Sequence, residues 1–477
     1  MFNYLNPMLL CDFYKISHRN MYPVGTEYVY STWTPRESRI PGIENVIVFG
    51  HQAFIIEWLI DFFDRNFFRA PKQAILDDYR VVIQSCLGQR EVDTTHISNL
   101  HDLGYLPLEI KSLPEGASVP IRTPIMTIVN TDPRFFWLTN YIETLASCSL
   151  WQASTSATIA KKYKDILNEW SLLSCKNSDF VPFQGHDFSM RGMSSLSSAV
   201  RSGMGHLLSF IGTDTIPAIQ GLNYYYDADY KARLIGTSIP ASEQSVQCAY
   251  NNDIAYFERL ISEVHPEGFV SIVSDGYDFW NVIENVVPVL KDKIMSREGK
   301  VVIRPDSGDP VKIVCGDPEG ETELQRIGAV RALYAIFGGT EISGIKQLDS
   351  HIGLIYGDAI TIARANEICK ILYNNGFSSN NIVFGIGSYT YQYNTRDTFG
   401  YALKSTAVVI NGIEKAIFKD PKTDSGTKKS QKGAVVVHED LTWSDGHSIF
   451  HAEKDLLRTI FKNGQLVIRD NFNNIKG

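Results

Sequence analysis

The chain has 477 residues, which is long for a single hydrophobic core, so we expect two domains or one large domain with an elaboration. Hydrophobic residues make up 44% of it and charged residues 21%, the composition of an ordinary soluble globular protein. The net charge of −8 argues against a general nucleic-acid binder, whose surface is normally basic. Any binding of phosphate must then come from local clusters of Arg and Lys.

The cysteines and the apolar segments predict a cytoplasmic protein. The seven cysteines are scattered, none at CxxC spacing, and their number is odd, so neither a disulfide framework nor a zinc site is indicated. The segment "MFNYLNPMLLCDFYK" has no basic region before its apolar run, which Asp12 interrupts, so we do not expect a signal peptide. No uncharged apolar stretch reaches the roughly 20 residues needed to cross a bilayer. We expect free thiols in a reducing cytoplasm.

In chain order, the first and the last parts of the sequence predict antiparallel β-structure. Residues 105–129 show short alternating segments separated by Pro and Gly, as antiparallel strands do. The segments "GAVVVHED" (433–440) and "GQLVIRD" (464–470) have the same character, whereas 420–433 is a polar loop. We therefore predict that residues 1–150 and 402–477 form one β-rich domain.

Residues 151–401 predict alternating strands and helices. Strands are expected within 269–278, 301–310, 352–360 and 381–390, and helices at 278–294, 323–337 and 361–377, the last ending at Gly376. The segments "FIGTDT" (210–215) and "LIGTSIPASEQS" (234–245) look like further strand ends. Strict alternation implies parallel pairing with the helices outside the sheet. An open doubly wound sheet is the competing architecture, but so many consecutive polar strand ends favour a closed α/β barrel.

Each strand of this region ends at polar or glycine residues, which would gather on one face of a barrel. These residues are Asp214, Glu243, Asp275, Arg304, Asp306, Gly357, Asp358, Gly385 and Gly387. A single Asp after a strand is usually explained by a turn or a helix cap. Several on one face, beside glycines that let a backbone approach a ligand, favour a site for ribose hydroxyls or a magnesium-bound group.

Arg304 and Asp306 follow a buried strand within "VVIRPDSGDP". A guanidinium matches the geometry of phosphate with two parallel hydrogen bonds, although Arg304 could equally form an internal ion pair with Asp306. Neither a P-loop nor a complete GxGxxG motif is present, so the motif alone is a weak signal of a sugar-phosphate site.

Two further clusters favour anion binding. Phe188 and Arg191 precede a helix of small residues and Leu, whose N-terminus would attract an anion, although Phe188 could equally belong to the core and Arg191 act as a cap. A late basic cluster contains Arg396, Lys404, Lys419, Lys428 and Lys429. In a chain of net charge −8 this concentration suggests a substrate with several phosphates, while a solvated loop is the alternative for the last two lysines.

Eight segments together resemble the nicotinamide phosphoribosyltransferase family. They are "CDFYKISHRNMYP", "HDFSMRG", "GTDT", "IVSDGYD", "IRPDSGDP", "IYGDAI", "NTRDTFGYALK" and "FKDP…KKSQKG", in the family's order and at similar spacing over nearly the whole chain. The resemblance implies that nicotinamide displaces pyrophosphate from phosphoribosyl pyrophosphate to give nicotinamide mononucleotide. It also implies an irregular parallel α/β barrel of the type II phosphoribosyltransferase kind, carrying the active site in residues 151–401, and a head-to-tail homodimer with active sites at the interface.

The resemblance assigns the nicotinamide contacts. Phe188 matches the residue on one face of the ring, and Tyr14, supplied by the partner subunit, matches the residue on the other. Two aromatic faces suit a flat, electron-poor ring that becomes a pyridinium. Asp214 matches the acceptor of the carboxamide NH₂, a contact that favours nicotinamide because the carboxylate of nicotinate would meet a like charge.

The remaining contacts implied by the resemblance surround the phosphoribosyl group. Arg191 and Arg304 resemble residues that bind pyrophosphate or phosphate. The ribose and its phosphate would be contacted by Asp306, Gly357, Asp358 and Gly387, with Asp275 as a further acidic neighbour. The phosphoryl ends would be contacted by Arg36, Arg396, Lys404 and Lys419, partly across the interface. Magnesium and these cations would stabilise the departing pyrophosphate as C1 approaches an oxocarbenium ion.

The chain departs from the family's pattern at two positions. Where the family has a histidine that ATP phosphorylates, the sequence "IPASEQSV" has Gln244, whose amide nitrogen is not nucleophilic. We therefore expect basal transfer by Arg304 and Asp306 to survive with Gln244 donating a hydrogen bond, and ATP coupling to be lost or greatly weakened. Ser388 replaces a glycine of the phosphate-binding turn, where its side chain would either crowd the phosphate or donate its hydroxyl.

Three alternative functions remain open from the sequence. The nearest is a nicotinate phosphoribosyltransferase with the same fold, and a more distant one is a barrel enzyme acting on another sugar phosphate. The third is a catalytically silent relative that binds nicotinamide or its nucleotide, an idea that Gln244 supports and the intact set of Phe188, Asp214, Arg304 and Asp306 opposes.

Overall fold

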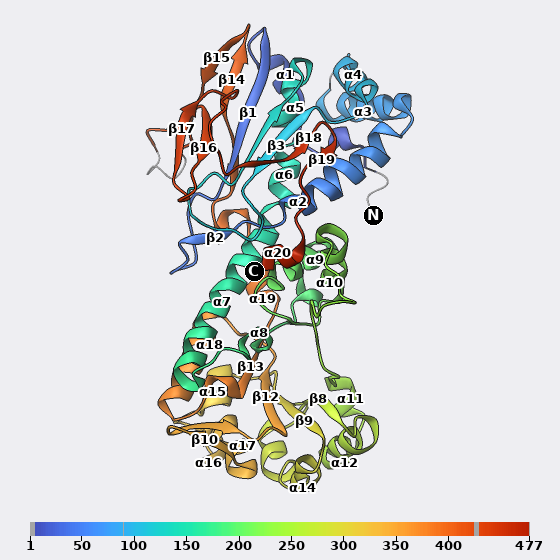
Figure 1. The fold of residues 1–477 in the computed structure, drawn as a ribbon. Coiled ribbons are helices and arrows are strands. Elements are labelled where there is room, and N and C mark those ends of the chain that lie inside the picture. The colour runs from blue at the N-terminus through green and yellow to red at the C-terminus, as the bar shows by residue number, and fades with distance from the viewer. Residues whose placement is uncertain (1–4, 89, 424–428, 477) are drawn as a thin grey trace. The chain divides into compact units, whose positions relative to one another are not determined.

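The computed structural model describes residues 5–88, 90–423 and 429–476 (Figure 1). The chain forms two compact units. The first comprises Met1–Thr158, Leu222–Ala228 and Asn394–Gly477, and the second comprises Ile159–Gly221 and Asp229–Tyr393. The chain passes between them four times: within helices α7 (Trp151–Cys175) and α10 (Ile216–Tyr226), between Ala228 and Asp229, and between Tyr393 and Asn394. Across the described ranges, no helix combines the length and the apolar character needed to span a membrane.

The first unit contains a seven-stranded antiparallel sheet in the order β15-β14-β1-β5-β3-β18-β19. Its strands are β1 (Thr26–Thr34), β3 (Leu108–Ser112), β5 (Met126–Asn130), β14 (Ala402–Ile410), β15 (Ile413–Ala416), β18 (Arg458–Lys462) and β19 (Gln465–Leu466). Strands from the two ends of the sequence are neighbours twice, in the pairs β1–β14 and β3–β18. This confirms the prediction of a β-rich domain built from both parts of the chain.

Two small strand pairs and a set of helices complete this unit. The pairs are β2 (Asn45–Ile47) with β4 (Ser118–Pro120), and β16 (Ala434–Val437) with β17 (Trp443–His447). The helices are α1 (Phe13–Met21), α2 (His51–Phe54) with its continuation to Phe68, α3 (Lys72–Leu87), α4 (Thr95–Leu103), α5 (Phe136–Tyr141), α6 (Glu143–Ser149) and α20 (Phe472–Lys476). Their apolar faces form one core with the sheet, in which Trp33 stacks on Tyr401 with ring centroids 5.3 Å apart.

A buried carboxylate explains why the short segment Leu222–Ala228 belongs to the first unit. Glu115 accepts hydrogen bonds from the backbone amides of Gly50 (2.8 Å) and Gln52 (2.7 Å) at the start of α2. It also accepts one from the hydroxyl of Tyr226 (3.2 Å), whose ring stacks on Phe49. Burial raises the pKa of Glu115 to about 7 despite these donors, because a carboxylate loses its hydration inside the protein.

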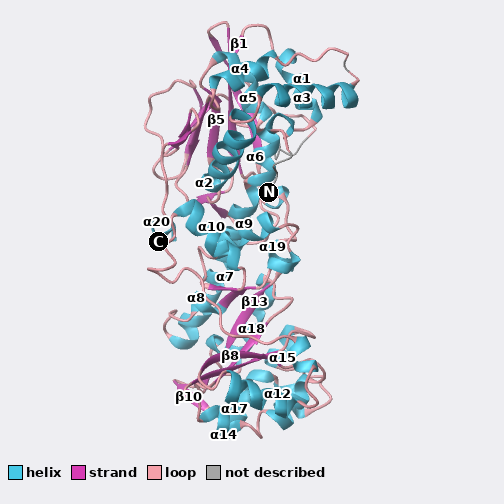
Figure 2. Cartoon of the chain, turned by 90° about the vertical axis from the view of Figure 1, so that its right-hand side faces the viewer, coloured by secondary structure: helices cyan, strands magenta, loops and turns pink. Residues whose placement is uncertain are grey.

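The second unit is built on a six-stranded parallel sheet in the order β7-β6-β13-β12-β9-β8. Its strands are β6 (Gly185–Asp187), β7 (Gly212–Thr213), β8 (Gly268–Val273), β9 (Gly299–Arg304), β12 (Ile352–Tyr356) and β13 (Ile382–Ile386). The four longer strands were all predicted, because their β-branched and apolar residues are buried on both faces as in other parallel sheets. Figure 2 shows helices flanking these strands.

An extended segment closes this sheet into an irregular barrel. Thr237 bridges to Gly212 of β7, and Ala241 bridges to Ser271 of β8, both in parallel. Backbone hydrogen bonds on each side support the bridges, from Thr213 N to Thr237 O (2.9 Å) and from Ser271 N to Pro240 O (2.8 Å). The segment 237–242 thus joins the two edge strands, and the predicted barrel is confirmed in an irregular form.

Helices of the second unit follow the predicted order with two interruptions. They are α8 (Val181–Gln184), α9 (Leu196–His206), α11 (Gln244–Cys248), α12 (Asp253–Arg259), α13 (Phe279–Asn281), α14 (Lys291–Met295), α15 (Pro310–Cys315), α16 (Glu323–Ile327), α17 (Ala329–Phe337), α18 (Ile362–Asn374) and α19 (Ser388–Tyr391). The helix predicted at 278–294 is broken near Pro288, which lacks an amide hydrogen, and that at 323–337 is broken at Gly328 with φ of 81°. An unpredicted hairpin, β10 (Gly339–Ile342) with β11 (Ile345–Leu348), follows α17.

We expect the Glu115→Gln variant to be less pH-dependent in stability than the wild type. Because the folded-state pKa of Glu115 is raised from 4.5 to about 7, its contribution is complete below pH 4.5 and is lost as the pH rises through 7. The wild type should therefore lose about 3 kcal/mol of unfolding free energy relative to the variant between pH 5 and 8. Denaturant unfolding at each pH measures this, with the exposed Glu44→Gln as control; parallel pH curves for wild type and Glu115→Gln would contradict it.

Candidate active site

A polar cavity of about 750 Å³ lies at the carboxyl ends of the parallel strands of the second unit. Six residues that the sequence predicted for the site line it together: Phe188, Arg191, Asp214, Arg304, Asp306 and Gly357. Glu243, another predicted strand-end residue, also lines it. These residues lie together because loops that follow parallel strands all emerge at the same edge of the sheet.

Arg304 and Asp306 form the most constrained part of this cavity. Arg304, the last residue of β9, donates from Nη2 to the carbonyl of Ser242 (2.5 Å) and so fixes the segment that closes the barrel. Its Nε lies 3.6 Å from Oδ2 of Asp306, which is an ion pair but too long for a hydrogen bond. Among the described residues, Nε of Arg304 and Oδ1 of Asp306 are buried without a hydrogen-bond partner. A ligand with both acceptor and donor groups would satisfy them.

Three carboxylates are brought together around Asp306. Asp275 accepts from the backbone amide of Asp306 (2.9 Å) and from the hydroxyl of Ser307 (2.6 Å), which orders the turn after β9. Burial raises the pKa of Asp306, and the charges of Asp275 and Asp358 raise it further, against the lowering effect of Arg304. Asp306 therefore lies among carboxylates as well as near Arg304 and Arg191, and its raised pKa suits contact with a hydroxyl donor or a cation.

Gly357 is required by the position of Asp306. A Cβ at residue 357 would lie 2.1 Å from Oδ1 of Asp306, far inside contact distance. The backbone after β12 and the carboxylate after β9 therefore touch directly. The glycine that the sequence suggested for close approach to a ligand is used, in this structure, for close approach to Asp306.

Asp214 is held by two neighbours that the sequence analysis missed. His186 donates from Nε2 to Oδ1 of Asp214 (2.9 Å), and Ser238 donates its hydroxyl to the same oxygen (2.6 Å). Burial by itself raises the pKa of Asp214, but these hydrogen bonds and the charge of Arg304 bring the pKa below the usual value of a carboxyl. Asp214 is thus an anion with a defined orientation. His186 lies two residues before Phe188, and strand alternation was the signal that could have placed both side chains on one face.

A second cavity of about 410 Å³ continues from the first along the inside of the barrel. It shares Phe188, Asp214 and Arg304 with the polar cavity. Its other lining residues are mostly apolar, including Phe180, Val302 and Ile355. The ring of Phe188 therefore lies where polar and apolar spaces meet, next to the ring of His186, 4.5 Å away between centroids.

Three further predicted residues of this unit are Arg191, Ser388 and Gln244, of which Arg191 lines the cavity. Arg191 is exposed, and the N-terminus of α9, capped by Ser195, also lines the cavity. Ser388 begins α19, and its Oγ lies 2.0 Å from where a Cβ of Gly192 would be, so its side chain packs against the backbone beside Arg191. Gln244 begins α11 next to Glu243, with its side chain exposed.

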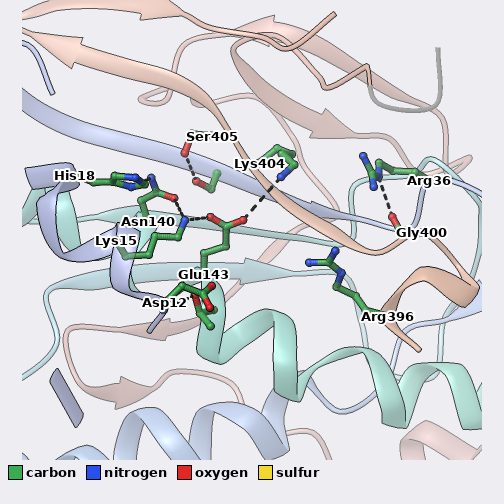
Figure 3. Close-up of polar contacts among 12 residues, drawn as sticks. Asp12, Lys15, His18, Arg36, Asn140, Glu143, Arg396, Gly400, Lys404 and Ser405 are labelled. Atoms are coloured by element: carbon green, nitrogen blue, oxygen red, sulfur yellow. Dashed lines mark hydrogen bonds and ion pairs between the residues drawn. The ribbon is translucent and has the colours of Figure 1, made fainter. Parts of the chain in front are cut away.

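The predicted basic residues form a separate group in the first unit, shown in part in Figure 3. Arg36 donates from Nε to the carbonyl of Gly400 (2.9 Å), and Lys404 on β14 lies opposite Thr32 of β1. Burial lowers the pKa of Lys404, whereas Glu143 raises it. The charges of Arg36, Lys419 and Arg396 also lower this pKa, so the four cations lie close enough to repel one another. A bound anion would reduce the repulsion among these cations. Lys429 is exposed and lies 3.6 Å from Asp420, whereas Lys428 lies outside the described residues.

Comparison with known proteins assigns the family. Residues 183–465 match the nicotinate phosphoribosyltransferase (NAPRTase) family model, and residues 6–110 match the nicotinamide phosphoribosyltransferase N-terminal domain. The chain belongs to the nicotinate phosphoribosyltransferase family. Within this family it is 47% identical to a nicotinamide phosphoribosyltransferase of Acinetobacter baylyi, over 99% of this chain and 96% of the relative. A nicotinamide phosphoribosyltransferase of Mycoplasma pneumoniae is 36% identical over 90% of this chain and 95% of its own.

Two solved structures share the fold at low sequence identity. Nicotinate-nucleotide pyrophosphorylase from Pyrococcus furiosus superposes with a TM-score of 0.58 at 12% identity, covering 99% of this chain and 94% of that one. Human nicotinic acid phosphoribosyltransferase gives 0.54 at 14% identity, covering 98% and 92%. The irregular barrel with a β-rich domain is therefore a fold that this chain shares with these two proteins.

We expect Gly357→Ala to impair the site of this family member more than its fold. The added methyl group must displace Asp306, since neither the backbone at 357 nor the turn after β9 has room. Phosphoribosyltransferase kcat/KM should fall at least about tenfold, while the melting temperature changes by a few degrees. Gly353→Ala on the same strand is the control, because its Cβ would meet the flexible side chain of Lys300 at 3.2 Å and Cγ2 of Val302 at an ordinary contact distance of 3.5 Å. Equal kinetic losses in both variants would refute the expectation.

Proposed function

We propose that this family member transfers the phosphoribosyl group of phosphoribosyl pyrophosphate to nicotinamide, giving nicotinamide mononucleotide and pyrophosphate in NAD salvage. The supporting observation is an ionised, oriented carboxylate, Asp214, beside the Phe188 ring in one cavity with the Arg304–Asp306 pair. The similarity of this chain to a nicotinamide phosphoribosyltransferase over nearly its whole length agrees with this assignment.

Nicotinamide is held through its ring and its amide. The Phe188 ring offers a flat apolar face at the boundary of the two cavities, and the ring becomes a pyridinium on reaction, which strengthens its interaction with an aromatic face. Asp214 accepts a hydrogen bond from the carboxamide NH₂. Because His186 and Ser238 favour the ionised form of Asp214, a nicotinate carboxylate meets a like charge and is rejected.

The phosphoribosyl pyrophosphate is held by the opposite wall. Nε of Arg304 and the guanidinium of Arg191 bind the pyrophosphate oxygens, and Asp306 accepts from a ribose hydroxyl. The C1–O bond breaks with its electron pair leaving on pyrophosphate, and the lone pair of the nicotinamide nitrogen forms the new N–C1 bond. The site contributes alignment and charge stabilisation, and little proton transfer is needed.

Magnesium enters with the substrate in this proposal. In the described part of the chain, no group of three His, Cys, Asp or Glu residues could hold a metal ion by itself. Mg²⁺ normally takes most of its ligands from phosphate oxygens and water, with one or two carboxylates. Asp306, with its unpartnered Oδ1, and Asp358 are the acidic groups suited to such a contact. Bound magnesium supplies charge neutralisation of the pyrophosphate.

A cytoplasmic homodimer completes the proposal. Tyr14 on α1 is 57% exposed, and the group of Arg36, Arg396, Lys404 and Lys419 has a large excess of positive charge. An aromatic face and four cations are the groups that a pyridine ring and several phosphates require. We assign them to the active site of the partner subunit.

ATP coupling is lost or greatly weakened in the proposed enzyme. Gln244 begins α11 beside Glu243, where the related enzymes are expected to have a nucleophilic histidine. The amide lone pair is delocalised, so Gln244 forms no phosphoenzyme, although its NH₂ can donate a hydrogen bond to pyrophosphate.

The first test compares the two bases. Purified protein with magnesium and phosphoribosyl pyrophosphate should convert nicotinamide in strong preference to nicotinate, and Asp214→Asn should lose about 10- to 100-fold in kcat/KM for nicotinamide and most of the preference. The exposed Asp292→Asn is the control for loss of a carboxylate. A wild-type preference for nicotinate would refute the role of Asp214, and binding without turnover would indicate a silent family member.

The second test concerns residue 244. ATP should change the nicotinamide KM and yield of the wild type less than twofold, because no phosphoenzyme forms. Gln244→His should acquire ATP hydrolysis and an ATP-dependent fall in nicotinamide KM of at least about tenfold, while Gln247→His on the same helix should not. A large stimulation of the wild type by ATP would overturn the proposal for Gln244.

A further inference from the structure

The exposed ring of Tyr14 lies on a helical turn whose two flanking residues are both tied down. Asp12 precedes α1 and Lys15 is its third residue, so they lie on either side of Tyr14 in the sequence. Tyr14 is 57% exposed, whereas Lys15 is 4% exposed. An exposed aromatic side chain beside a buried lysine is unusual, because lysine is almost never buried unless it is paired.

Lys15 is paired with α5 and α6. Its ammonium group donates to the amide oxygen of Asn140 (3.0 Å) and to Oε2 of Glu143, the first residue of α6 (Figure 3). The Glu143 side chain is 18% exposed, so the ion pair is largely removed from water. Breaking such a pair leaves a buried charge uncompensated, which makes the contact a strong constraint on the position of α1.

The other side of Tyr14 is tied to the next residue of α6. Thr144 donates its hydroxyl to Oδ2 of Asp12 (2.8 Å), and the backbone amide of Asp12 donates back to the same hydroxyl (3.3 Å). Two adjacent residues, Glu143 and Thr144, thus hold Lys15 and Asp12. The turn that presents Tyr14 is fixed at both ends by one point of α6.

The ion pair also sets the charge beside the Tyr14 ring. The ammonium group of Lys15 lies 5.1 Å from the ring centroid, and the ring of His18 meets it edge-on at 5.1 Å. If it were unpaired, the Lys15 ammonium group would bind the electron-rich face of the Tyr14 ring and would repel a pyridinium stacked on that ring. Glu143 neutralises the charge of the Lys15 ammonium group. The other carboxylate oxygen of Glu143 lies 3.9 Å from Nζ of Lys404, so one carboxylate lies between the Tyr14 turn and the basic group.

We propose that Glu143 and Thr144 are positioning residues for Tyr14: they hold its helical turn rigid and neutralise the ammonium beside its ring, which sets the affinity for the pyridine base. The inference rests on the proposed function, in which Tyr14 stacks on nicotinamide. Neither residue touches the substrate. Thr144 contacts Asp12, so its effect should appear in the base KM and not in the affinity for phosphoribosyl pyrophosphate. Glu143 also faces Lys404, so its variants are expected to change both KM values, that of the base more strongly.

A matched pair at residue 144 tests the tether. Thr144→Val keeps the volume and removes the hydroxyl, so the nicotinamide KM should rise about fivefold, with kcat and the phosphoribosyl pyrophosphate KM within about twofold. Thr144→Ser keeps the hydroxyl and should restore the wild-type KM. Amide hydrogen exchange of residues 13–21 should be faster in Thr144→Val than in Thr144→Ser, a readout that does not depend on activity.

Glu143→Gln tests the ion pair. It leaves Lys15 charged and buried, so the nicotinamide KM should rise about 10- to 100-fold and the protein should lose stability. If Glu143→Gln does not fold, the double variant Lys15→Met/Glu143→Gln removes both charges. It loses the tether but leaves no bare ammonium beside the ring, so the nicotinamide KM should rise about fivefold, as in Thr144→Val. The control is Glu109→Gln, which breaks a half-buried contact to Lys462 (3.4 Å) in the same unit and should leave both KM values unchanged.

The outcomes separate the inference from the proposed function. If wild-type protein forms nicotinamide mononucleotide and Thr144→Val matches Thr144→Ser in KM and in hydrogen exchange, the inference is overturned and the function stands. An equal rise in the KM values of both substrates in Thr144→Val would indicate a structural role only and also overturn it. If wild-type protein neither turns over nor binds nicotinamide, the function falls and the role of the pair for the base falls with it.

Discussion

The closure of the parallel sheet is the constraint on which the second unit and its cavity depend. Segment 237–242 hydrogen-bonds to β7 on one side and to β8 on the other, so the two edges of a six-stranded sheet meet through a stretch without regular strand structure. Arg304 fixes this segment by donating to the carbonyl of Ser242. Closure also puts Ser238 beside Asp214 and Glu243 at the cavity. The same guanidinium that closes the barrel faces the cavity, so scaffold and site are built from one side chain.

Three carboxylates have different environments and therefore different pKa values. Asp214 is surrounded by donors and has a lowered pKa, Asp306 lies among other carboxylates and has a raised pKa, and Glu115 is buried in the core with a pKa of about 7. The first is an anion held by two hydrogen bonds, and the second suits contact with a hydroxyl or a cation. The third ties a distant segment into the first unit. Net charge describes none of this, because a pKa is set by the few groups within contact distance.

Much of the architecture was predictable, for identifiable reasons. β8, β9, β12 and β13 are short runs of buried β-branched residues bounded by Gly, Pro or Asp, a pattern that local sequence reveals. The prediction of one continuous helix at 323–337 was wrong, because Gly328 has a positive φ that ends the first helix. The hairpin β10–β11 was not predicted, because its residues are largely exposed. In the site, Arg304 and Asp306 were predicted from a motif. His186 and Ser238 were not, because they reach Asp214 only when β6, β7 and the closing segment are neighbours.

The sequence by itself determined the α/β class, the β-rich domain from both chain ends, the strand-end residues and the family resemblance, because these depend on local periodicity and on motifs within a few residues. Only the tertiary structure decided that the barrel closes through 237–242, that Gly357 makes room for Asp306, and that Glu143 and Thr144 flank the Tyr14 turn. These are contacts between residues far apart in the chain. Their existence depends on the packing of whole elements, which no local pattern specifies.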